Sequence, residues 1–152
     1  MKKVTIYALL GFLFFLNTAS MCSSDDSTSM NNQSDVINTA TSGTWKITLY
    51  NDSGVVKTTN FSGYNFTFAT SGVLTVVGNG ATLSGTWSVT DTNSTDDSID
   101  DLDFNIFFAS PVDFADLTDD WDIISKTATK IQLIDISGGN GGTDYLTFEK
   151  NL

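Results

Sequence analysis

The sequence predicts an all-β fold, an antiparallel meander of eight or nine strands that closes into a barrel or a sandwich, with one short helix. Three observations lead to this prediction. Apolar and polar residues alternate over several stretches, as they do in half-buried strands. Turns rich in Gly, Asn and Ser separate these stretches at regular intervals. The length of 152 residues and the hydrophobic content of 40% fit one packed domain.

The first 21 residues are predicted to be a lipoprotein signal peptide. Lys2 and Lys3 are followed by an apolar run over residues 4–16, which is shorter than the roughly 20 residues that cross a membrane. The residues Ala19-Ser20-Met21-Cys22 resemble a bacterial lipobox, in which Cys22 becomes the lipid-modified first residue. Lipoboxes usually carry Leu and a small residue where this chain has Ala19 and Met21. The alternative is ordinary cleavage after Ser20, which leaves Cys22 as a lone thiol in an exported protein.

The residues after Cys22 provide a second targeting feature. Ser24, Asp25 and Asp26 resemble the export signal that sends lipoproteins of Bacteroidota to the outer cell surface, and the alternative is the solvated start of a linker. We therefore expect a lipid-anchored protein of the outer membrane that faces the cell surface. Residues 22–42 are nearly all polar and small, so we expect them to form a disordered tether before a barrel domain over residues 43–152.

Four stretches give the clearest strand pattern. They are residues 44–50, with Trp45, Ile47 and Leu49 on one face, and residues 64–68, 81–89 and 102–108. Weaker candidates are residues 55–61, 73–77, 120–125, 130–136 and 144–149.

A short helix is expected near residues 111–117. Ser110 suits the N-cap, and Pro111 suits the first helical position. Phe114 and Leu117 would share a face and close one end of the β structure.

A repeated Gly-x-Trp pattern points to a family. Gly43-Thr44-Trp45 opens the first strand, and Gly85-Thr86-Trp87 repeats the pattern. Together with residues 64–68 and 146–150, these motifs resemble the lipocalin-like domain of small bacterial lipoproteins. The resemblance spans residues 43–150 and implies a lipocalin-like, calycin-type barrel. Lipocalins carry a late Arg over the first Trp, and because this chain has none we expect Lys150 to take that place by a cation–π contact.

The three tryptophans are expected to belong to the core. Burying one indole removes about 200 Å² from water, and Gly43 and Gly85 would leave room for the rings that follow them. We therefore expect Trp45, Trp87 and Trp121 to fill the barrel, and the alternative is that they stack on a ligand. No ligand-binding residue of the lipocalins is carried over to this sequence.

The composition excludes several chemistries. The chain has no His, and all seven of its basic residues are Lys, so catalysis by His and arginine clamps are excluded. Removing the two signal lysines leaves 5 Lys against 18 acids, a net charge of −13, which argues against nucleic acid as a partner and favours a soluble domain.

Two regions suggest calcium but fail its ligand pattern. Residues 91–103 hold six Asp, yet Asp96 stands where an EF-hand requires Gly, and Leu102 stands where it requires Glu. Residues 138–144 form a single Gly-rich turn, and one such unit binds calcium poorly. We therefore expect no metal and no cofactor.

Five acids flank Trp121 and raise the question of a glycosidase, namely Asp113, Asp116, Asp119, Asp120 and Asp122. We interpret these acids as a polar turn, because Glu149 is the only Glu in the chain and no lone buried acid is evident. We therefore expect no enzyme.

Three functions remain open. The leading one is an envelope lipoprotein that takes a small apolar or amphiphilic ligand in its barrel. The second is a structural or adhesive surface module with a self-filled barrel. The third is a polysaccharide-binding module, for which Tyr50, Phe107 and Tyr145 are the aromatic residues off the core face. We expect a monomer that contacts the membrane through the lipid on Cys22.

Overall fold

The computed structural model describes residues 28–91, 102–137 and 141–152, and the side chains of Gln33 onward within them. In chain order its elements are α1 (Thr28–Ala40), β1 (Thr44–Asp52), β2 (Val55–Val56), the 3-10 helix η1 (Thr58–Phe61), β3 (Tyr64–Phe68), β4 (Val73–Gly78), β5 (Ala81–Asp91), β6 (Leu102–Phe107), α2 (Val112–Ala115), β7 (Asp119–Lys126), β8 (Lys130–Ile136) and β9 (Thr143–Lys150).

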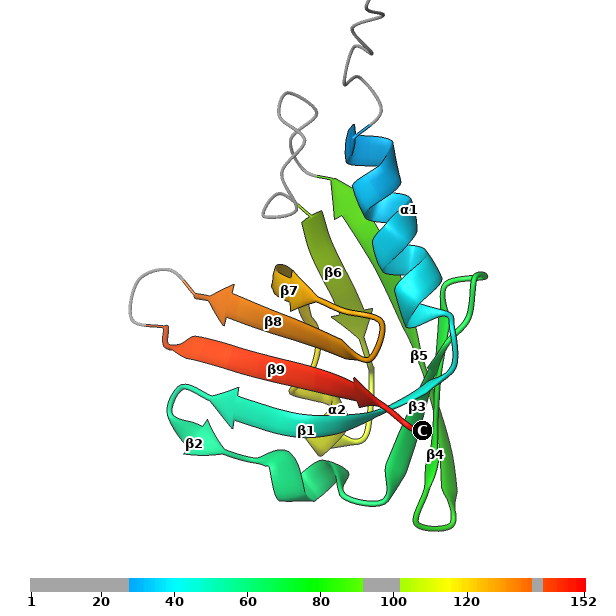
Figure 1. Ribbon diagram of the computed structural model, residues 1–152. Coiled ribbons are helices and arrows are strands. Elements are labelled where there is room, and N and C mark those ends of the chain that lie inside the picture. The colour runs from blue at the N-terminus through cyan, green and yellow to red at the C-terminus, as the bar shows by residue number, and fades with distance from the viewer. Residues whose placement is uncertain (1–27, 92–101, 138–140) are drawn as a thin grey trace, which may run out of the picture.

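Eight of the nine strands form a closed barrel (Figure 1). Every neighbouring pair is antiparallel, and from β3 to β9 the strands lie side by side in chain order. The barrel closes because β1 pairs with β3 on one side and with β9 on the other. The extra strand, β2, pairs only with the end of β1. The predicted antiparallel barrel is therefore confirmed.

The alternating apolar residues point into the barrel, as the strand pattern predicts. In β6, Leu102, Phe104 and Ile106 are buried, and Phe108 directly after the strand is buried as well. The chain alternates sides with a period of two, so the intervening residues of β6 face outward.

Two residues of β1 face the opposite side from the one predicted. Trp45 and Ile47 are buried as expected, but Leu49 is exposed and Tyr50 is buried. The register of β1 against β9 shifts between Ile47 and Leu49. Such a bulge adds one residue to the strand and exchanges its faces, so a strict period-two pattern assigns Leu49 and Tyr50 to the wrong sides.

The predicted strand over residues 55–61 is mostly wrong. Only Val55–Val56 pairs as a strand, and Thr58–Phe61 turns into the 3-10 helix η1. The Thr58 side chain accepts a hydrogen bond from the Tyr50 backbone N–H at 2.9 Å, which holds this turn against β1. The turn places Phe61 in the core, which a continued edge strand would not do.

The prediction of a disordered tether over residues 22–42 is wrong where the structure describes that segment. Thr28–Ala40 forms α1, in which Val36 and Ala40 are fully buried and Ile37 packs against the core. The Ala40 carbonyl accepts a hydrogen bond from Nε1 of Trp45 at 2.8 Å. The average polarity of the segment hid an apolar stripe with helical spacing. The folded unit therefore begins before residue 43.

The short helix α2 forms close to the predicted place, over Val112–Ala115. Its N-cap is Pro111 and not Ser110, and no side chain caps it. Phe114 and Leu117 are both buried, so the segment covers the core as predicted.

The three tryptophans are buried, which confirms that they belong to the core. Nζ of Lys150 lies 5.7 Å from the centre of the Trp45 ring, which confirms the expected cation–π contact. Gly43 and Gly85 leave room for residues other than the tryptophans. A Cβ at Gly43 would lie 3.0 Å from Cε of Lys150, and a Cβ at Gly85 would lie 2.7 Å from ring atoms of Phe108. The expectation that these glycines make room for indole rings was therefore wrong.

Candidate functional site

The interior of the barrel is occupied by its own aromatic rings. The Phe68 ring makes edge-on contacts, at centroid distances of 5.1, 5.4 and 5.4 Å, with Trp87, Phe104 and Phe148. These four residues belong to one continuous cluster of buried apolar side chains. Rings at these distances are in contact, so the centre of the barrel is packed.

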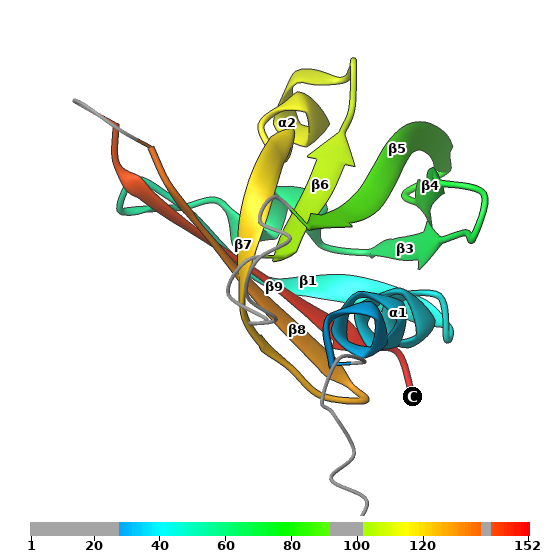
Figure 2. The same ribbon diagram turned by 90° about the horizontal axis from the view of Figure 1, so that it is seen from above.

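The barrel end at which β1 begins is covered by α1. Nε2 of Gln33 donates a hydrogen bond of 2.8 Å to the carbonyl of Val89, near the end of β5. On the far side, Lys126 at the end of β7 forms an ion pair with Asp35. Together with the bond from Trp45 in β1, these contacts fix α1 across this end of the barrel (Figure 2).

The opposite end is covered by η1 and α2, and α2 lies away from α1 in both views (Figures 1 and 2). The Phe114 ring of α2 lies at centroid distances of 5.3, 5.1 and 5.5 Å from Phe61, Tyr64 and Phe108. The Tyr50 hydroxyl donates a 2.7 Å hydrogen bond to the Asp116 carbonyl, which ties β1 to the residue that follows α2. Both ends of the barrel are thus covered by elements of this chain.

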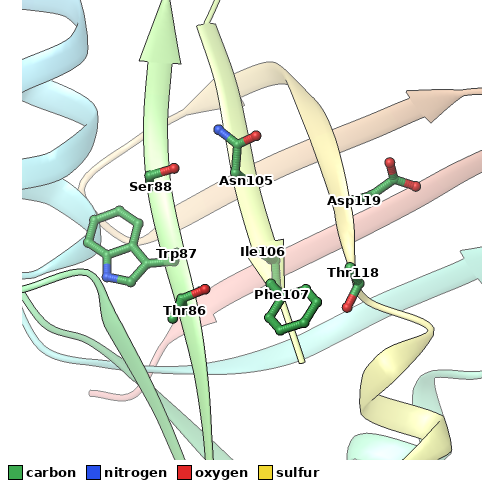
Figure 3. A pocket seen from close by; sticks show the side chains of 8 residues that line it. All are labelled: Thr86, Trp87, Ser88, Asn105, Ile106, Phe107, Thr118 and Asp119. Carbon is green, nitrogen blue, oxygen red and sulfur yellow. The ribbon is translucent and has the colours of Figure 1, made fainter. Parts of the chain in front are cut away.

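A groove of about 490 Å³ lies on the outside of the barrel, across β5, β6 and the start of β7 (Figure 3). The outward side chains of β5 and β6, together with Thr118, line it in two rows. In Figure 3 Ser88 lies beside Asn105, and the second row holds Thr86, Phe107 and Thr118. The strand register agrees, since Ser88 pairs with Asn105 and Thr86 pairs with Phe107. Asp119 also borders the groove, but it pairs with Ile106 and so shares the inward face of β7 with Trp121, whereas Asp120 lies opposite Asn105.

The groove forms where β6 and β7 separate. Their last paired residues are Ile106 and Asp119, and the chain then leaves the sheet toward α2. The Thr118 hydroxyl bridges the opening, accepting a 2.9 Å hydrogen bond from the Phe108 N–H and donating one of 3.2 Å to the Phe108 carbonyl.

Phe107 provides the apolar part of the groove. Its side chain is 53% exposed, whereas the neighbouring Phe108 is buried. Consecutive residues of a strand point to opposite faces, so only one of the two rings can enter the core. The other stands on the outer surface beside Thr86.

The polar side chains of the groove are only partly engaged. Nδ2 of Asn105 donates a 2.8 Å hydrogen bond to the Thr90 hydroxyl, and its carbonyl oxygen accepts none from the residues that the structure describes. The hydroxyls of Thr86 and Ser88 likewise have no partner within that part of the chain. These groups are free to bind a ligand.

Two acids of β7 lie beside the groove, Asp120 opposite Asn105 and Asp119 opposite Ile106. Burial, together with the adjacent carboxyl of Asp120 and the nearby charge of Asp135, raises the pKa of Asp119 to about 6. Its Oδ1 accepts a 3.0 Å hydrogen bond from the Asp120 backbone N–H. No Lys is among the residues that line the groove. The groove therefore disfavours anionic ligands.

The predicted acidic run around Trp121 is divided by the fold. Asp116 forms an ion pair with Lys57 at 3.0 Å, and Asp113 accepts a hydrogen bond from Asn60 at 3.2 Å. Asp119 lines the groove. Asp122 lies opposite Asp103 on the adjacent strand β6, and burial, with added repulsion from neighbouring acids, raises the pKa of both carboxyls.

A second groove, of about 300 Å³, lies between α1, the turn after β3, and β5. Its apolar lining comes from Ile37, Trp87 and Val89, and its polar lining from Thr70, Ser71 and Ser88. Neither groove enters the centre of the barrel.

The residues predicted for anchoring and export lie outside the described residues, namely Cys22, Ser24, Asp25 and Asp26. Most of the acidic loop over residues 91–103 lies outside them too, as do residues 138–140 of the Gly-rich turn. Within residues 28–91, 102–137 and 141–152, no group of three or more potential metal ligands comes together. Over the same residues, no helix has the length and apolar character needed to span a membrane.

The three off-face aromatics do not form one platform. Tyr50 is 1% exposed, so its assignment to the outer face was wrong, and the bulge in β1 explains this. Phe107 and Tyr145 are exposed, but β7 and β8 lie between their strands. Sequence reasoning flagged Phe107 but missed the groove, because its polar residues come from three strands. The Phe107-Phe108 pair was the signal available.

The fold and the site thus define a closed antiparallel β-barrel module with a packed interior and an open polar groove on its outer face. Comparison with protein-family models found no match, and comparison with curated proteins found none either. Among solved structures, the crystal structure of a DUF4847 family protein from Bacteroides vulgatus is similar, with a TM-score of 0.49 and 18% sequence identity. The similarity covers 76% of this chain and 97% of that chain.

Proposed function

We propose that this protein is a non-enzymatic envelope lipoprotein whose lipocalin-like barrel is a rigid scaffold for binding at its outer surface. The observation that carries this proposal is the barrel itself, which is filled by its own side chains and covered at both ends. A ligand inside would have to displace rings such as Phe68 and Phe148, each of which is buried. Removing one such ring from a core costs about 3–5 kcal/mol.

The anchor in this proposal is a lipid on Cys22, in the outer membrane and facing the cell surface. Cys22 is the only Cys in the chain, it follows an apolar run, and Ser24, Asp25 and Asp26 come shortly after it. Cys22→Ser should move the protein from the membrane fraction to the soluble fraction or block its processing. A variant that fractionates with membranes like the parent protein contradicts the anchor.

Two features of the sequence support a role without catalysis. The chain offers no His or Arg to act on a substrate. In the fold, Asp116 forms an ion pair with Lys57 and Asp113 accepts a hydrogen bond from Asn60, so the acids around Trp121 do not gather at one site.

A second candidate is a small amphiphilic ligand bound beside α1. The groove between α1 and β5 has apolar walls, and its volume of about 300 Å³ reaches the lower limit of small-molecule sites. The two candidates differ in whether the protein retains a fatty acid. We expect native mass spectrometry of the protein mixed with dodecanoate to show no retained ligand, and a complex of one protein with one dodecanoate favours the second candidate.

A further inference from the structure

We propose that the outer groove across β5, β6 and β7 binds one neutral pyranose unit of a glycan, stacked on Phe107 and hydrogen-bonded by Asn105 and Ser88. This inference rests on the proposed function, because it names the ligand class for the outer surface of a barrel whose interior is packed.

The stacking surface is the exposed Phe107 ring. A pyranose has one face formed mainly by C–H groups, and this face packs against aromatic rings, whose electron-rich faces attract the C–H hydrogens. Phe107 is 53% exposed, and it has no aromatic partner within the described part of the chain. The ring is thus free to accept a sugar.

Hydrogen-bonding groups lie where the hydroxyls of a stacked sugar would reach. Asn105 is two residues before Phe107 on the same face of β6, about 7 Å along the strand, and Ser88 pairs with it on β5. On β7, Asp120 lies opposite Asn105 and extends this polar row (Figure 3 shows Ser88 and Asn105 side by side). A pyranose is about as wide as this interval, so one unit can contact the ring and this polar row together.

The unpaired hydrogen-bond donors and acceptors of the groove match the hydroxyl groups of a polyol. The Asn105 carbonyl oxygen is an acceptor, and the Thr86 and Ser88 hydroxyls both donate and accept. Vicinal sugar hydroxyls present donors and acceptors side by side and satisfy such a set. An apolar ligand would leave these groups without partners, which costs free energy for each buried group.

The charge of the groove selects a neutral sugar. Asp120 lies opposite Asn105 on the outer face of the barrel, and no Lys belongs to the lining. Sulfated or uronic acid sugars would be repelled. The volume of about 490 Å³ is within the range of small-molecule sites.

The test is a titration of the isotope-labelled full-length protein, followed by two-dimensional NMR of its amide groups. The neutral probes are the methyl glycosides of glucose, galactose, mannose and N-acetylglucosamine. The charged probes are glucose 6-sulfate and pentylamine. Three proteins are compared: the parent, Phe107→Ala, and Tyr145→Ala, which removes an exposed aromatic residue of β9 outside the groove.

We expect at least one neutral glycoside to shift the amide signals of Ser88, Asn105, Phe107 and Asp119. Phe107→Ala should weaken this binding at least tenfold, and Tyr145→Ala should leave it unchanged. A panel in which no neutral glycoside binds, binding that survives Phe107→Ala, or binding of pentylamine alone each overturns the inference. None of these outcomes touches the proposed function, which fails separately if dodecanoate enters the barrel.

Discussion

Trp45 joins β1 to α1 and to the end of the chain, so its truncation tests how much the packing of the barrel contributes to stability. The ring is fully buried in the core. Its Nε1 donates to the Ala40 carbonyl at 2.8 Å and so joins β1 to α1. Its face lies under Nζ of Lys150, 5.7 Å from the ring centre, which joins β1 to the end of the chain.

The cost of Trp45→Ala follows from these contacts. Loss of a buried aromatic ring, including the cavity that remains, costs about 3–5 kcal/mol. The unsatisfied Ala40 carbonyl adds to this, because a buried acceptor that loses its partner costs about 1–3 kcal/mol unless water reaches it. A domain of this size has a free energy of unfolding of about 5–15 kcal/mol. One substitution should therefore remove a large share of the stability.

The assay is urea unfolding followed by circular dichroism, which does not depend on tryptophan fluorescence. We expect Trp45→Ala, and Trp87→Ala likewise, to lower the unfolding midpoint strongly. The matched control is Phe107→Ala, because Phe107 is a large aromatic residue that is 53% exposed, and it should change stability by less than about 0.5 kcal/mol. A folded Trp45→Ala protein with the parent midpoint would refute the packing argument.

Three further predictions concern α1, pH and metal. Val36→Ala should lower the free energy of unfolding by about 1–2 kcal/mol, because Val36 is fully buried. The control, Asn38→Ala on the exposed side of α1, should not lower it. Equal effects of the two substitutions in urea unfolding would contradict the packing of α1 on the barrel. The pKa of Asp119 is raised from 3.8 to about 6, so the folded state binds its proton more tightly and stability falls as pH rises between these values. Asp119→Asn should abolish that fall. It should raise the free energy of unfolding by about 1 kcal/mol at pH 7, allowing for solvent screening, and should not raise it below pH 3.8. Melting curves recorded across this pH range check both expectations. A chelator should leave the thermal midpoint unchanged, and a drop of several degrees would show that the loop over residues 91–103 or the Gly-rich turn holds a metal.

The strands could be predicted because their signal is local. In β6 the alternation of Leu102, Phe104 and Ile106 directly reports which side each residue faces. The closure of the barrel was predicted from the number and spacing of strands and from the Gly-x-Trp resemblance, and the pairing of β1 with β9 confirms it.

The errors arose where a non-local contact overrides local pattern. Residues 28–40 look polar on average, but Val36 and Ala40 gain burial against the barrel, and this gain stabilises a helix that the composition alone does not indicate. The bulge before Leu49 changes the face of Tyr50, and a bulge leaves no clear mark in a single sequence.

The outer groove was only partly predictable. The adjacent pair Phe107-Phe108 implies one exposed ring, since neighbours on a strand face opposite sides. The neighbours of that ring, Thr86 and Thr118, come from other segments of the chain and meet it only through the folding of the sheet. No spacing within the sequence indicates this meeting.

The central claim, a barrel that is filled and closed by its own side chains, is tested most directly by the indole N–H signals of the three tryptophans. Each Nε1 donates to a backbone carbonyl, that of Ala40, Ala69 or Leu117, at 2.8, 2.9 or 3.1 Å. In an NMR titration with dodecanoate, the signals of Trp45 and Trp121 should stay in place, because these two rings line neither groove and no ligand reaches them. A saturable shift of the indole signals of Trp45 or Trp121 would contradict the account and place the ligand inside the barrel.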